Sequence, residues 1–156
     1  MNESKGTGPL MKLGIILAAV IIILRIILEQ AGAPEIANNI FGVAWLYFIF
    51  PVLFAVRIGK DQATGRVKAL LNNVVLFALY TRLMVMVSYM AAYAFQWRAP
   101  RFSAAMGGNV GPDVGPLSGV LIIPVRNALI WVVGATIIGM IIGGITLMLR
   151  RKPLPA

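Results

Sequence analysis

Arg82 is the residue with the clearest potential for chemistry, because a long run of apolar residues surrounds it. It lies 14 residues after Lys68 and 15 before Trp97, so a helix rising 1.5 Å per residue would place it near the middle of a membrane. Inserting an arginine there costs at least ~2.5 kcal/mol, and such residues commonly mark functional sites. The chain has five acids, and none lies at that depth: Glu3, Glu29, Glu35, Asp61 and Asp113. We therefore expect Arg82 to meet a helix carbonyl, a tyrosine, water, a ligand or another subunit.

Two tyrosines and a second arginine extend this candidate site. At 100° per residue, Tyr89 and Tyr93 fall on the same helix face as Arg82. Arg126 lies near the start of the last apolar run. The four residues form our predicted contact site for a ligand or partner. The alternative is that Arg82 caps carbonyls freed near Pro51, while the tyrosines belong to an interfacial aromatic belt.

Small residues form a separate pattern in the last apolar run. Ala135, Gly139 and Gly143 are spaced four residues apart, and small residues at this spacing let two membrane helices approach closely. The pattern predicts a helix contact, either within the chain or between two copies of it.

Side chains for most catalytic and metal chemistry are missing. The chain contains no cysteine and no histidine, which excludes thiolate nucleophiles, His-based triads and the usual zinc, haem and iron–sulfur ligand sets. Arg25 and Glu29 have the i, i+4 spacing of an ion pair, which we interpret as an anchor at a membrane interface. We therefore expect no enzyme activity, no catalytic residues and no metal site. The sequence leaves open whether a quinone, pigment or lipid is bound.

The amino-acid composition indicates that these residues lie in a membrane protein. Hydrophobic residues make up 60% of the 156 residues and charged residues 12%, and the mean hydropathy is +0.88. Soluble domains carry about 25% charged residues. We expect one all-α transmembrane domain of four helices, spanning about 13–29, 40–58, 69–95 and 120–149, with an irregular outer loop at 96–119.

The basic residues predict the orientation of this bundle. Nine lysines and arginines would lie beside the two termini and the loop between the second and third spans, while Arg98 and Arg101 alone would lie beside the 96–119 loop. Because cytoplasmic loops collect basic residues, we expect both termini in the cytoplasm. The same bias explains the formal net charge of +9 without nucleic acid as a partner. The expected location is the plasma (inner) membrane of a bacterium.

Two functional hypotheses fit these observations. The first is a noncatalytic accessory or assembly subunit of a larger membrane protein complex, in contact with lipids and with other subunits or a second copy of itself. The alternative is a small oligomeric transporter or channel for an anionic or lipid-like substrate. A proton or cation path is disfavoured, because no acid lies at midplane depth.

Overall fold

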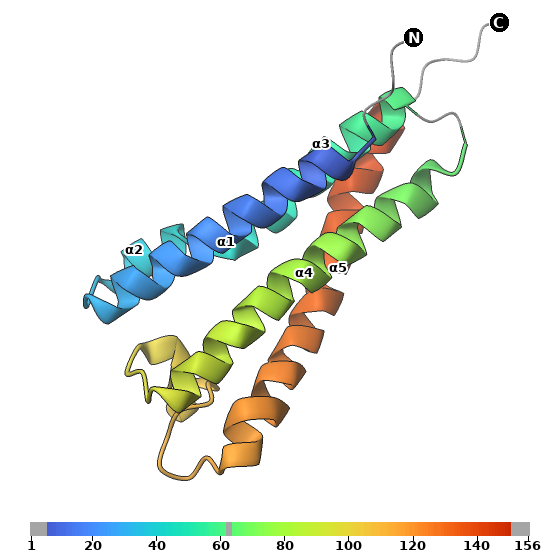
Figure 1. Ribbon diagram of the computed structural model, residues 1–156. Coiled ribbons are helices and arrows are strands. Elements are labelled where there is room, and N and C mark those ends of the chain that lie inside the picture. Colours follow the sequence, from blue (N-terminus) through green and yellow to red (C-terminus); the bar gives the residue numbers. More distant parts are fainter. Residues whose placement is uncertain (1–5, 62–63, 151–156) are drawn as a thin grey trace, which may run out of the picture.

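The computed structural model describes residues 6–61 and 64–150, and its regular elements there are helical (Figure 1). The longer helices are α1 (Gly8–Gln30), α2 (Glu35–Ile40), α3 (Leu46–Asp61), α4 (Arg66–Ala94) and α5 (Ile123–Leu149). Short turns are η1 (Val43–Trp45), η2 (Pro100–Phe102), η3 (Ala104–Met106) and the π-helical η4 (Ser118–Ile122).

The expectation of an all-α chain with four membrane-length helices is confirmed. The stretches long and apolar enough to cross a membrane are Gly8–Gln30, Ile36–Asp61, Arg66–Ala94 and Ser118–Leu149. The first helix begins five residues earlier than expected, because Pro9 fits its first turn, where a missing N–H costs nothing. The helix α4 begins directly after Gly65, whose φ of 70° suits glycine at a turn.

The second span is interrupted near its start. The helix α2 ends at Ile40, and Gly42 is extended (φ −95°, ψ 132°) before the η1 turn leads into α3. The helix α3 then continues through Pro51. The interruption separates a short helical segment from the part of the span that packs in the core.

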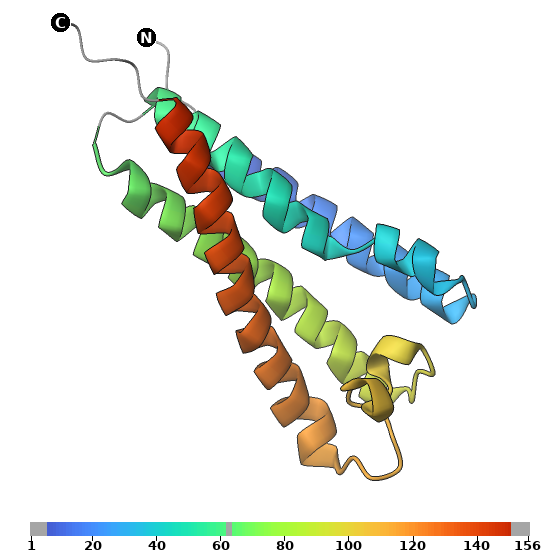
Figure 2. The ribbon, with the colours of Figure 1, turned by 180° about the vertical axis from the view of Figure 1, so that it is seen from behind.

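In Figures 1 and 2, α1 and α3 separate from α4 and α5 toward one end of the bundle, and we refer to these two sets of helices as the two pairs. The start of α1, the end of α3 and the end of α5 lie at what we call the termini end. The α1–α2 turn and the 95–117 loop lie at the opposite, loop end. The pair of α1 and α3 meets the pair of α4 and α5 near the termini end and separates from it toward the loop end.

Aromatic side chains fill the core between the pairs. Phe50 and Phe54 of α3 and Phe77 of α4 are each at most 1% exposed, and the rings of Phe50 and Phe77 stack with centroids 4.8 Å apart. Gly14 lets α1 lie against them, since a Cβ there would be 2.7 Å from both rings. Three helices therefore meet around one aromatic cluster.

The predicted small-residue ridge lies inside the bundle. Ala135, Gly139 and Gly143 are all buried. A Cβ on Gly139 would lie 2.6 Å from Val74 of α4 and 3.1 Å from the Pro51 ring of α3. The ridge therefore lets α5 approach both α3 and α4, and this contact holds the two pairs together.

A leucine at position 139 should force these helices apart. We expect Gly139→Leu to lower stability by about 1–3 kcal/mol, the usual cost of overpacking, measured as thermal unfolding in detergent. The matched control is Gly134→Leu on the same helix, where an added Cβ meets nothing within 4 Å. Equal effects of the two substitutions would show that the ridge is not a close contact.

Candidate functional site

Arg82 is buried between two aromatic rings. The residue is 7% exposed, and its Cζ lies 5.1 Å from the ring centroid of Tyr47 on α3 and 4.3 Å from that of Trp131 on α5. Each such cation–π contact contributes about 0.5–2 kcal/mol. The Arg82 Nε is buried and makes no hydrogen bond within the part of the chain that the structure describes. The rings thus stabilise the charge but leave an N–H group unpaired.

A hydroxyl pair holds the Tyr47 ring in place. The Tyr47 hydroxyl lies 2.7 Å from Thr81 Oγ1, and Thr81 Oγ1 donates to the Phe77 carbonyl at 2.8 Å. Because the Thr81 hydroxyl hydrogen is used there, Tyr47 is the donor to Thr81. Thr81, the residue before Arg82 on α4, therefore holds the Tyr47 ring against the Arg82 guanidinium.

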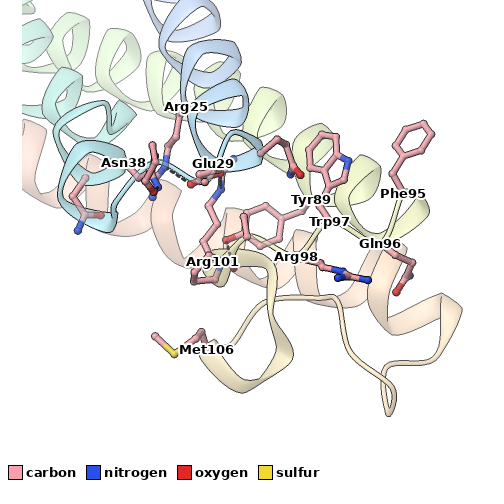
Figure 3. A pocket seen from close by; sticks show the side chains of 16 residues that line it. Arg25, Glu29, Asn38, Tyr89, Phe95, Gln96, Trp97, Arg98, Arg101 and Met106 are labelled. Carbon is pink, nitrogen blue, oxygen red and sulfur yellow. Dashed lines mark hydrogen bonds and ion pairs between the residues drawn. The ribbon is translucent and has the colours of Figure 1, made fainter.

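A buried carboxylate joins α1 to the loop (Figure 3). Glu29 is 3% exposed at its side chain, with Oε1 2.8 Å from Arg25 Nε and Oε2 2.8 Å from Arg101 Nε. The contact between Arg25 and Glu29 is also a hydrogen bond. The contact between Arg101 and Glu29 is an ion pair whose geometry is not that of a hydrogen bond. The Nη2 atom of Arg101 is buried and makes no hydrogen bond to any described residue. Burial lowers the pKa of Arg101 and the Glu29 charge opposes this, so the guanidinium remains charged.

The loop that carries Arg101 is tied to the last part of α4 and to η4. Asn109, fully buried, donates from Nδ2 to the carbonyls of Tyr89 and Gly119, both at 2.7 Å. Phe102 is also fully buried, and its ring meets Tyr89 edge-on at 5.1 Å. These contacts fix the position from which Arg101 reaches Glu29.

Arg25, Arg82 and Arg101 line one cavity, which we call the arginine chamber. Its volume is about 190 Å³, and it is lined by Arg25, Val43, Ala44, Arg82, Val85, Tyr89, Arg101 and Trp131. With Glu29 paired to two of the arginines, three positive charges meet one negative charge, a net charge of +2. Side chains from α1, η1, α4, α5 and the loop all contribute to its wall.

A larger cavity adjoins the arginine chamber at the loop end. This vestibule has a volume of about 870 Å³ and shares Arg25, Tyr89 and Arg101 with the chamber (Figure 3). Asn38 and Arg98 are among its other lining residues. The shared residues form the boundary between the vestibule and the chamber.

The structure brings together only part of the predicted contact site. Arg82 and Tyr89 both line the arginine chamber. Tyr93 instead donates to the Val114 carbonyl at 3.0 Å and packs against Gly119. Arg126 is exposed, with Nη2 3.5 Å from Asn127 Oδ1. Neither of these two residues lines the chamber or the vestibule.

Sequence reasoning missed Arg25 and Arg101 as parts of the site. The sequence predicts only an interfacial anchor for Arg25 with Glu29, and it indicates only a loop charge for Arg101. The two meet because one carboxylate accepts both. The available signal was the ratio of 14 basic to five acidic residues in the chain, which makes a shared carboxylate such as Glu29 a natural partner for several arginines.

Removing the shared carboxylate should destabilise the loop end. We expect Glu29→Gln to lower the free energy of unfolding by up to about 3 kcal/mol, since it leaves two partly buried guanidinium groups unpaired. It should also expose the 96–117 loop to proteases. Asp61→Asn is the matched control, because it breaks the Arg57–Asp61 pair, also 2.8 Å and i, i+4, at the termini end. If the two variants unfold and cleave alike, the Glu29 bridge does not hold the loop.

The comparisons with known proteins do not supply an identity for this chain. No protein-family model, no curated protein and no solved structure matches it.

Proposed function

We propose that this chain is a noncatalytic membrane protein that binds an anionic group in the arginine chamber. Two buried N–H groups without hydrogen bonds to described residues, Arg82 Nε and Arg101 Nη2, belong to side chains that line this one cavity. Leaving buried charged donors unpaired is costly, whereas pairing them with an anion gives short, charge-assisted hydrogen bonds. This observation carries the proposal.

The charge balance supports the same function. Arginines remain ionised at all physiological pH values, so the net charge of +2 around the chamber persists. In a medium of low dielectric constant this charge favours an anion more strongly than it would in water. A chamber that binds and releases an anion fits a small transporter or channel for an anionic or lipid-like substrate.

A role as an accessory or assembly subunit is the second candidate. Here the anionic group would be an aspartate or glutamate on a membrane helix of another subunit. The observation that favours it is that none of the ion pairs within the described residues includes Arg82. The chamber wall also includes Trp131, which is 48% exposed and lies within a membrane-length helix. A partner helix could therefore reach the chamber from the side.

The proposal includes an orientation in the plasma membrane of a bacterium, with both termini cytoplasmic and the loop end outside. The excess of lysine and arginine near the termini end supports it. In this orientation the vestibule opens to the outer face, and the arginine chamber lies between it and the membrane interior.

Single cysteines should report this orientation directly, because the chain has none of its own. We expect Ala105→Cys, exposed in the loop, to react with an impermeant maleimide in intact cells. We expect Thr64→Cys, exposed between α3 and α4, to react only after the membrane is opened. Labelling of both positions, or of Thr64→Cys alone, in intact cells would refute the orientation.

Substitution of Arg82 should remove the anion response. We expect phosphate, exchanged for chloride at constant ionic strength, to raise the unfolding temperature of the purified protein, since a ligand at 100 times its Kd adds about 2.7 kcal/mol. Arg82→Leu should abolish this increase. Arg82→Lys should retain part of it, because lysine keeps the charge but loses the planar fork.

Arg126→Leu is the matched control, since Arg126 is an exposed arginine outside both cavities. It should respond to phosphate as the unmodified protein does. An equal response in Arg82→Leu would refute anion binding in the chamber. If phosphate has no effect but a subunit with an intramembrane acid copurifies in mild detergent and is lost in Arg82→Leu, the second candidate is correct.

A further inference from the structure

The arginine chamber has features that specify the class of its ligand. Building on the proposed function, we infer that the chamber binds the phosphate monoester head group of a membrane lipid, which enters from the membrane beside Trp131. Charge, volume and the nature of the wall each contribute to this assignment.

The net charge of the arginine chamber favours a ligand with two negative charges. The guanidinium groups of Arg25, Arg82 and Arg101 and the carboxylate of Glu29 are the charged groups at the chamber, with a net charge of +2. A phosphate monoester carries about −1.5 to −2 charges at neutral pH, because its second pKa is about 6. A phosphodiester or a carboxylate carries a single negative charge and would leave one positive charge uncompensated. The monoester is therefore the better match.

Hydrogen-bond donors add to this preference. The unpaired Nε of Arg82 belongs to the middle of α4, and the unpaired Nη2 of Arg101 belongs to the loop. A terminal phosphate presents three strong acceptor oxygens, so it can accept from both arginines at once. Arginine is the side chain best suited to such contacts with phosphate.

Volume limits the part of the ligand that enters. The chamber of about 190 Å³ is smaller than the roughly 300–1,000 Å³ of pockets that enclose a whole drug-sized molecule. It can hold a phosphate group but not the acyl chains of a lipid. The remainder of the ligand must lie outside the chamber, in the vestibule or in the membrane.

The apolar part of the chamber wall favours a ligand that comes from the membrane. Between the arginines the chamber is lined by Val43, Ala44, Val85 and Trp131, and Trp131 is 48% exposed within a membrane-length helix. The surface of α5 next to it is also apolar, with Ile130 62% exposed. Acyl chains attached to a bound phosphate can therefore continue along α5 into lipid.

The test compares lipids that differ only in the head group. Purified protein in neutral detergent is mixed with phosphatidic acid, with phosphatidylglycerol of the same acyl chains, or with inorganic phosphate, and binding is measured by native mass spectrometry and thermal shift at pH 7.4. We expect phosphatidic acid to bind about tenfold more tightly than phosphatidylglycerol, and inorganic phosphate more weakly than either. Arg82→Leu should lose the preference, whereas Arg126→Leu should keep it.

The outcomes separate this inference from the proposed function. Equal binding of the two lipids, with loss of both in Arg82→Leu, would refute a dianionic ligand but leave anion binding in place. Inorganic phosphate binding as tightly as phosphatidic acid would refute the membrane as the source. Lipid and phosphate binding that is the same in Arg82→Leu and the unmodified protein would refute both. If Arg82→Leu does not fold, Arg82→Lys provides the test, with weakened phosphatidic acid binding expected and unchanged binding contradicting the inference.

Discussion

The burial of the Arg82 charge is the constraint on which the arrangement of the loop end depends. An arginine in a membrane-length helix must be stabilised by neighbours, and the structure provides two aromatic faces, from Tyr47 on α3 and Trp131 on α5, but no carboxylate in contact among the described residues. Aromatic faces stabilise a cation, and the Arg82 Nε still makes no hydrogen bond to a described residue. This explains how Arg82 is tolerated in the fold while it remains able to bind an anion.

The divergence of the two helix pairs creates the space for this chemistry. Close contact at Gly139 and Gly143 fixes α5 against α3 and α4 on the termini side of Arg82, and the pairs separate beyond it (Figure 2). The loop then closes the wider end, held by Asn109 to α4 and η4 and by Arg101 to Glu29 of α1. Packing at one end and polar tethers at the other thus define a chamber between them.

The sequence predicted the parts of this molecule that depend on local patterns. Four apolar runs predicted four helices, the depth of Arg82 predicted an unusual environment, and the Ala135–Gly139–Gly143 spacing predicted a close contact. It did not predict that Arg101, 72 residues after Glu29, shares that carboxylate, because the fold of a Gly- and Pro-rich loop depends on tertiary contacts. Arg126, which the sequence placed in the predicted contact site, is exposed and lines neither cavity.

The most direct test of the central claim is a crystal structure of the protein grown in lipid with selenate, a tetrahedral dianion that can be located by its anomalous signal. The account predicts an anomalous peak in the arginine chamber, within hydrogen-bond distance of Arg82 and Arg101. Absence of the peak at saturating selenate, with the Arg82 Nε hydrogen-bonded to a carbonyl of its own chain, would contradict it and leave Arg82 as a structural cap.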